Sequence, residues 1–324
     1  MGPRISRLDQ DGVAAVARNG SPRRSSDEER RKSAEEKVNG HAHAHREDNP
    51  KFDIPHHLKG IPRLEVQHYL MRFLYQGNFS SPIQETLNAG NARVLDLGCG
   101  AGTWAIEVAK EFPSAQVIGV DITNFFPSDV TTPNVKFILH NFQERKRLPF
   151  DDNAFDFVHM RFLLADVKEE DYQNTLIPEL VRVTKPNGWI ELLEFDVQHY
   201  SEGPVIRRLT NSLSKHLQSK GYNPKISEKL PHYLKQTNNV DKILQFDKAI
   251  PLGHWAGRVG DLAIEDLSIL FLDSKELPQS MGVTDEEYQN LVSEYKEEVE
   301  ERRTFFRTHR FFTKKISKIN PEKS

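Results

Sequence analysis

The chain has one cysteine, Cys99, so no disulfide can form within it. It has no apolar run long enough to cross a bilayer, and no apolar N-terminal segment of the kind that directs secretion. It also has no excess of positive charge, because 44 Lys and Arg residues are set against 47 Asp and Glu residues. These absences argue against a disulfide-stabilised secreted domain, a membrane protein and a dedicated nucleic-acid binder. We expect a cytoplasmic protein.

Residues 1–50 contain few large apolar side chains and many Arg, Ser, Glu and His residues. Such a segment cannot bury enough apolar surface to offset the entropy of ordering, so we predict a disordered tail. Basic clusters at 23–24 and 30–32 fit a split nuclear-import signal, although a solvated tail is the simpler interpretation. The alternating histidines of 41–45 would need a rigid scaffold to hold a metal ion, and we expect no metal site.

The most informative stretch is 93–102, with the sequence RVLDLGCGAG. Its apolar residues are typical of a buried parallel strand, and its glycines permit a tight turn against a ligand. A helical pattern follows, and residues 116–121 predict a second strand that ends at Asp121. The order strand, glycine loop, helix, strand, acid is typical of the nucleotide-binding half of a doubly wound α/β sheet.

Asp96 indicates which of two classes of ligand this glycine loop binds. The G-x-G-x-G spacing lacks the third glycine of the dinucleotide pattern, and a carboxylate at the end of the strand repels a pyrophosphate but attracts an ammonium group. S-adenosyl-L-methionine carries an ammonium and a sulfonium and has no phosphate. We therefore predict that it is the cofactor, with Asp96 at its cationic end and Asp121 on its ribose hydroxyls; NAD is the alternative.

The segments VLDLGCGAG and IGVD resemble motif I and the downstream acid of class I S-adenosylmethionine-dependent methyltransferases. Other segments resemble that family in the expected order, at 137–142, 148–150, 155–158 and 179–189. Within the family, the chain looks similar to fungal methyltransferase-domain proteins, which include LaeA-like regulators and relatives of trans-aconitate methyltransferase. The resemblance covers about 64–196.

This resemblance implies an α/β fold, a Rossmann-like doubly wound sheet of seven strands with a helical cap or lid insertion. The expected organisation is a disordered tail at 1–50, an N-terminal helical cap at 51–90, a cofactor-binding core at 91–200, a helix and lid insertion at 201–283, and a C-terminal helix with an edge strand that completes the sheet at 284–324.

The motif and the resemblance together indicate a set of cofactor-binding residues. Tyr69 and Arg72, on a helix predicted over 64–75, are candidates for lining the cleft, with simple packing as the alternative. Asn141 stands where the family often has an acid that accepts the adenine amino group, and an amide oxygen can do the same. The complete set is Tyr69, Asp96, Gly98, Cys99, Gly100, Gly102, Asp121, Ile122, Asn141 and Phe142.

His159 and Arg161 are the candidate catalytic residues. They end a strand predicted from residue 155 onward, at the edge of the sheet where ligands bind in open α/β folds. A hydroxyl acceptor would use His159 as a base, whereas a carboxylate acceptor needs no base and would be oriented by Arg161. A hydrogen-bonded structural role is the alternative for His159.

Each of three further segments has two possible roles. Glu194 and Asp196 are expected on one face of the next strand, as cation ligands or bases or as a solvated rim. Residues 222–282 are longer than an ordinary connection and are expected to hold the acceptor lid, in which 254–258 is either pocket wall or core plug. Residues 303–316 interleave aromatic and basic side chains, a pattern that suits nucleic acid, but the resemblance favours a final antiparallel edge strand.

The sequence therefore predicts an enzyme that transfers a methyl group from S-adenosyl-L-methionine to a small-molecule acceptor, with O-methylation of a carboxylic acid or secondary metabolite favoured. The alternative is a LaeA-like nuclear regulatory methyltransferase that controls secondary metabolism through a protein partner. We expect neither a nucleic-acid partner nor a membrane partner.

Overall fold

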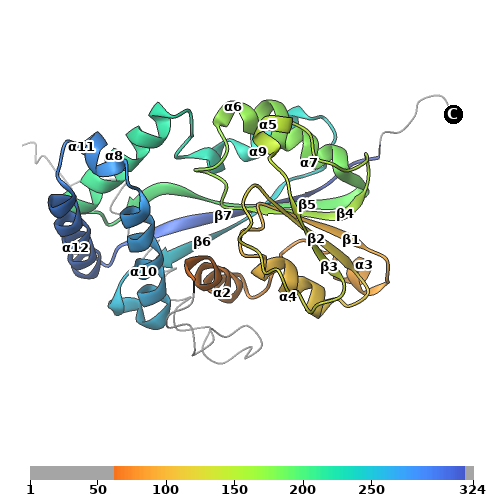
Figure 1. Ribbon diagram of the computed structural model, residues 1–324, viewed down its shortest axis with the longest axis horizontal. Helices are drawn as coiled ribbons and strands as arrows, with labels where there is room; N and C mark the ends of the chain where they lie inside the picture. The colour runs from red at the N-terminus through yellow and green to blue at the C-terminus, as the bar shows by residue number, and fades with distance from the viewer. Residues whose placement is uncertain (1–61, 318–324) are drawn as a thin grey trace, which may run out of the picture.

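The computed structural model describes residues 62–317, which form a seven-stranded sheet with helices on both faces (Figure 1). The strand order is β3-β2-β1-β4-β5-β7-β6, and only β7 runs antiparallel to its neighbours. This is the α/β, doubly wound sheet predicted from the sequence. The strands are β1 (Arg93–Leu97), β2 (Gln116–Asp121), β3 (Val135–Leu139), β4 (Phe155–Arg161), β5 (Thr184–Tyr200), β6 (Leu244–Pro251) and β7 (Phe305–Lys314).

The helices on the two faces come from different parts of the chain (Figure 1). In the described residues none of them is both long enough and apolar enough to pass through a membrane. The longer ones are α2 (Arg63–Tyr75), α4 (Thr103–Glu111), α7 (Ile177–Val183), α8 (Pro204–Ser219), α9 (Leu230–Gln236), α10 (Gly257–Asp273) and α12 (Asp285–Arg302). The shorter ones are α3 (Gln84–Asn88), α5 (Phe142–Arg145), α6 (Glu169–Asp171), η2 (Tyr172–Leu176), η3 (Ile226–Glu228), η4 (His254–Ala256) and α11 (Leu277–Met281).

Two apolar cores lie on opposite faces of the sheet, because successive side chains of a strand point to opposite sides. On β1, Val94 belongs to the smaller core, which is packed by α3 and α4, whereas Leu95 and Leu97 belong to the larger one. The larger core also takes in residues of α2, α7, α8, α10 and α12. Any β1 side chain therefore faces either the α4 side or the larger core according to its position.

The last strand is placed differently from the prediction. We expected residues 303–316 at the edge of the sheet, but β7 pairs with β5 on one side and with β6 on the other. The neighbouring side chains Phe311 and Phe312 point to opposite faces and are both buried, as a strand inside a sheet requires. The edge strand is β6, where Phe246 is 51% exposed. Since the β7 phenylalanines lie in the core, they are not available to stack on nucleic acid.

A buried carboxylate attaches the segment after α2 to the sheet. Glu191 on β5 is 0% exposed and accepts hydrogen bonds from the backbone N–H groups of Ser80 and Ser81. Arg310 on β7 lies 3.3 Å from the same carboxylate and stacks on the ring of Tyr75. This charged cluster fixes the C-terminal end of α2, and with it the position of the helix over the ligand-binding edge of the sheet.

We predict that a protonated histidine between β5 and β6 stabilises the fold below about pH 9. His309 on β7 lies 2.9 Å from Asp247 and 3.4 Å from Asp196. Burial alone would lower the pKa of His309, but its bonds to these carboxylates outweigh burial and raise the pKa to about 9. A folded-state pKa above the unfolded one gives a stabilisation that is complete below the unfolded pKa and is lost as pH rises through the folded pKa.

The measurement is urea unfolding of the wild type and His309→Gln at about pH 6 and about pH 10. The wild type should exceed the variant by at most about 3 kcal/mol at the lower pH, and most of this difference should vanish at the higher pH. An equal difference at both pH values would show that the charge of His309 has no role.

Candidate functional site

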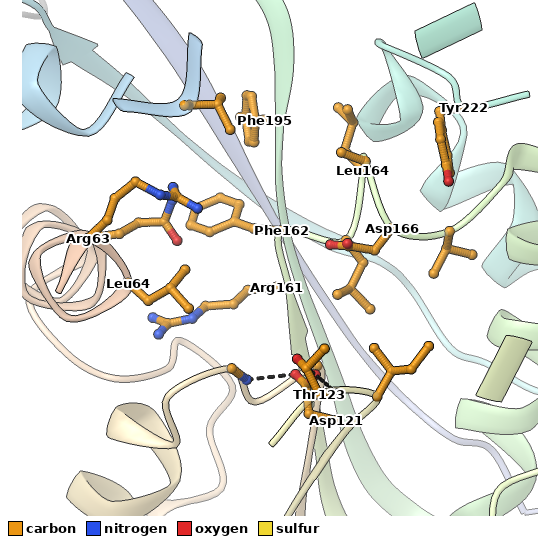
Figure 2. A pocket seen from close by; sticks show the side chains of 18 of the residues that line it. Arg63, Leu64, Asp121, Thr123, Arg161, Phe162, Leu164, Asp166, Phe195 and Tyr222 are labelled. Carbon is orange, nitrogen blue, oxygen red and sulfur yellow. Dashed lines mark hydrogen bonds between the residues drawn. The ribbon is translucent and has the colours of Figure 1, made fainter. Parts of the chain in front are cut away.

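A cavity of about 740 Å³ opens at the carboxyl ends of the parallel strands (Figure 2). Its floor consists of residues 97–101 after β1, 120–123 at the end of β2, and 161–167 after β4. Its walls come from α2, α8 and α10. This volume is in the usual range for small-molecule and cofactor sites, and the carboxyl edge is where open α/β sheets bind ligands.

The glycine loop makes a tight turn at the cavity because three of its residues, Gly98, Gly100 and Gly102, adopt a left-handed backbone. Gly98 has a φ of 69°, and a Cβ atom there would lie 2.5 Å from the Leu163 side chain. Gly102 has a φ of 75° and precedes α4, and a Cβ there would lie 2.5 Å from the Phe137 ring. Side chains other than hydrogen are excluded at both positions.

Asp121 links the glycine loop to the end of β2. Its Oδ2 accepts a 2.8 Å hydrogen bond from the Gly100 N–H (dashed in Figure 2), and its Oδ1 accepts hydrogen bonds from the Thr123 N–H and hydroxyl at 2.9 Å. Oδ1 already accepts two hydrogen bonds, but Oδ2 has a second lone pair, so Asp121 can still accept a hydrogen bond from a ligand in the cavity. This geometry agrees with the expected position of the acid, while its ribose contact stays a prediction.

The prediction for Asp96 is wrong in this structure. The side chain is 2% exposed, does not line the cavity, and accepts a 2.8 Å hydrogen bond from His159 Nδ1. The reason lies in strand alternation and register: Asp96 shares the α4 face of β1 with Val94, and β4 places His159 directly beside it. We expected the carboxylate at the ligand because it comes near the end of a strand, but the next residue, Leu97, is the one that faces the cavity.

The structure places His159 away from the cavity, and not at it as the catalytic prediction expected. It is 1% exposed, its ring stacks on Trp104 at 3.9 Å, and it lies outside the lining of the large cavity. Burial lowers the pKa of His159, so the neutral ring donates its Nδ1 proton to Asp96. The alternative, a hydrogen-bonded structural histidine, is the one that the geometry supports.

Three other expected cofactor contacts also lie outside the cavity lining. Tyr69 is on a different side of α2 from the lining residues Leu64 and Met71, and its ring packs edge-on against His68. Asn141 uses its side chain to cap α5, and Gly102 lies under Phe137. The expected residues that do line the cavity are Gly98, Cys99, Gly100, Asp121, Ile122, Phe142 and Arg161.

Arg161 reaches from the end of β4 toward α2 (Figure 2). Its Nη1 lies 3.2 Å from His68 Nδ1, and burial lowers its pKa to about 10. It therefore remains a cation at neutral pH on the wall of the cavity. The expected role in orienting an acceptor stays a prediction.

The opposite end of the cavity is mainly apolar. Its lining there comes from segments that carry no recognisable motif, and includes Phe162, Leu164, Phe195, Leu213, Leu217, Tyr222, Leu267 and Leu270. At its rim, Lys220 of the α8 end forms an ion pair with Glu276, which also lies 3.8 Å from His216. The cavity thus has a polar end at the glycine loop and an apolar end between α8 and α10.

Part of the segment 222–282, expected to hold the acceptor lid, lines the cavity, whereas 254–258 does not form pocket wall and Trp255 packs against the Phe305 cluster. Leu267 and Leu270 of α10 line the cavity, but no residue of 254–258 does. His254 is exposed and pairs with Asp261. Glu194, considered as a base or rim residue, is fully buried under Leu163, and burial raises its pKa to about 8.

Sequence reasoning missed several polar residues of the cavity. Asp166 follows β4 and, as Figure 2 shows, directs its carboxylate into the cavity. Its position after a parallel strand is a usable signal, the same one that pointed to Arg161. Arg63 and Asp266 form a 3.0 Å ion pair between α2 and α10 across the cavity wall, which only the tertiary structure reveals.

Comparison with known proteins identifies the class. Residues 94–188 match a family model described as a methyltransferase domain. The chain is 30% identical over 155 residues to methyltransferase str3 of Strobilurus tenacellus, covering 47% of this chain and 54% of that protein. It is 31% identical over 157 residues to N-methyltransferase tcpN of Claviceps purpurea, covering 45% and 53%. It is 37% identical over 117 residues to secondary metabolism regulator laeA of Coprinopsis cinerea, covering 33% and 26%.

The fold, the glycine loop and this match identify residues 94–188 as a methyltransferase domain within a doubly wound sheet. Within that class, the chain is similar to two fungal methyltransferases and to a secondary metabolism regulator. The predicted fold and family are confirmed. The match extends over about half the length of the first two of these relatives, and over a smaller part of the third.

We predict that Gly98→Ala destabilises the protein more than Gly90→Ala. Both glycines have a positive φ, but a Cβ at Gly98 would collide with Leu163, whereas nothing lies within 4 Å of one at Gly90. Each variant should lose about 1–2 kcal/mol from left-handed backbone, and Gly98→Ala a further 1–3 kcal/mol, roughly, from the collision. Urea unfolding measures both, and equal losses would refute a close contact between the glycine loop and the residues after β4.

Proposed function

We propose that this protein transfers a methyl group from S-adenosyl-L-methionine to a small-molecule acceptor with an apolar body. The observation that carries the proposal is the single cavity that joins the glycine loop and Asp121 to an apolar end between α8 and α10. One cavity with two chemically different ends suits a polar donor and a less polar acceptor held together. The walls from α2, α8 and α10 favour a free small molecule over a residue on a protein surface.

In this proposal the donor lies across the ends of β1 and β2. The Gly98 and Gly100 backbone would contact its methionyl part, Asp121 its ribose, and Ile122 with Phe142 its adenine. Methyl transfer from a sulfonium is an in-line displacement, so the protein mainly has to align the acceptor atom with the methyl group and exclude water.

We propose O-methylation, with a carboxylic acid or another secondary metabolite as the acceptor. A hydroxyl acceptor would need a base, and His159 is held by Asp96 beneath the cavity. A carboxylate is ionised at neutral pH and needs no base, and Lys220, which pairs with Glu276, provides a cation at the rim of the apolar end. The alternative of nitrogen as the acceptor atom is raised by the name of the tcpN relative.

A LaeA-like regulatory role is the second candidate. The similarity to the laeA regulator over 117 residues favours it. The basic clusters that suggested nuclear import lie outside the described residues. Localisation of a tagged chain with and without residues 1–50 discriminates the two candidates, because strict cytosolic residence argues against a nuclear regulator.

The main experiment is donor binding by calorimetry, followed by incubation of metabolite extracts with S-adenosyl-L-methionine that carries an isotopically labelled methyl group. The expected result is binding of this donor, no binding of NAD, and a labelled product with its methyl group on oxygen. Binding of NAD in place of the donor would refute the proposal. A methyl group found on nitrogen would refute only the acceptor assignment.

We predict that Asp121→Ala weakens donor binding at least about tenfold, because a hydrogen bond to a charged group is worth about 1.5–3 kcal/mol. Asp129→Ala is the matched control, since it removes the same charge from an exposed residue outside the cavity lining. Calorimetric titration with S-adenosyl-L-homocysteine measures both variants. Similar affinities for the two variants would argue against Asp121 as a ligand contact.

A further inference from the structure

Arg161 is a partly buried cation that has no counter-ion in the described part of the chain. Within residues 62–317 its guanidinium contacts His68 Nδ1 at 3.2 Å and forms no ion pair with a carboxylate within 4 Å. Removing a charge from water is costly unless a partner of opposite charge replaces the solvent. Because Arg161 also lines the cavity, an anionic group of a bound ligand is in a position to be that partner.

His68 holds this guanidinium without neutralising it. Its Nε2 lies 2.9 Å from Glu107 of α4, and its Nδ1 lies 3.2 Å from Arg161 Nη1. Burial lowers the pKa of His68 to about 4, so the ring is neutral at physiological pH. A neutral ring that donates from Nε2 to the carboxylate must accept at Nδ1, which fixes the tautomer and directs the Arg161 N–H toward it.

The Glu107 carboxylate interacts with a second residue of α2 in addition to His68. Arg72 Nε lies 3.2 Å from the same carboxylate oxygen that contacts His68. The chain Arg161, His68, Glu107 therefore ties the end of β4 to α2 and α4 through buried or partly buried groups. An acidic residue in place of His68 would pair with Arg161 directly and leave less of its charge for a ligand.

The position of Arg161 indicates which anion it would bind. Met160, the preceding residue, pairs with Leu97, which directly precedes Gly98. Figure 2 shows the guanidinium under Leu64, on the side of the cavity where Gly100 bonds to Asp121. The guanidinium therefore lies at the glycine-loop end of the cavity.

We propose that Arg161 binds the carboxylate of the methionyl part of the donor, and that His68 is the positioning residue that holds Arg161 for this contact. The inference rests on the proposed function, because it assumes that the glycine-loop end takes the donor. It makes Arg161 a contact of the donor and not of the acceptor. Through His68, it also gives α2 a role in donor binding.

The test compares S-adenosyl-L-methionine with its decarboxylated form, which lacks only the carboxylate. Calorimetry should show that the wild type binds the complete donor at least about tenfold more tightly. Arg161→Met should bind both forms with similar affinity. Failure of the wild type to bind either form would refute the proposed function, whereas equal binding of the two forms by the wild type would refute only the inference.

Two substitutions of His68 isolate its positioning role. His68→Asn keeps an acceptor oxygen near the place of Nδ1 and should retain most of the preference for the complete donor. His68→Gln places its amide toward Glu107 and should lose most of that preference. A preference retained in both variants would overturn the role of His68, and a preference lost in both would show that the ring itself, and not its acceptor atom, holds Arg161.

The matched control is His199→Gln. His199 is also buried, its Nε2 lies 2.8 Å from the Tyr295 hydroxyl, and it does not itself line the cavity. This variant removes a buried imidazole without touching Arg161, and it should keep the wild-type preference. Far-UV circular dichroism and thermal melting of each variant separate loss of fold from loss of the carboxylate contact.

Discussion

The Asp121 carboxylate is the interaction on which the geometry of the cavity depends. It accepts hydrogen bonds from Gly100 on the glycine loop and from Thr123 after β2, so one acid fixes two neighbouring loops relative to each other. A loop of glycines alone would have many backbone conformations, and fixing them costs entropy. Because both bonds come from the backbone or from a short hydroxyl, the loop is formed before any ligand arrives, which suits a site that must align two substrates.

His159 and Arg161 have different surroundings, although alternation puts them on the same face of β4. Asp96 and His159 lie on the α4 face and satisfy each other beneath the floor. Arg161 continues the same strand beyond the floor and meets the cavity. His159, which has a structural role, and Arg161, which can contact a ligand, are two positions apart. The register between β1 and β4 determines which of them lies beside Asp96.

The sequence predicted the elements better than it predicted their side-chain contacts. The run of strand, glycine loop, helix and strand was recognisable because each part has its own periodicity or turn chemistry. The orientation of Asp96 was missed because proximity to a strand end does not say which face a residue occupies. The place of β7 was missed because strand order depends on tertiary pairing, and the α10 wall carries no motif at all.

The interior place of β7 also governs the order in which this protein can be completed during synthesis. In the described residues β6 pairs only with β7, which follows it by more than fifty positions and comes near the end of the chain. In the sheet β7 lies between β5 and β6. While the ribosome is still translating α12, β7 does not yet exist, and β6 therefore has no strand with which to pair. The first five strands can associate early, but β6 can join the sheet only after β7 has been synthesised.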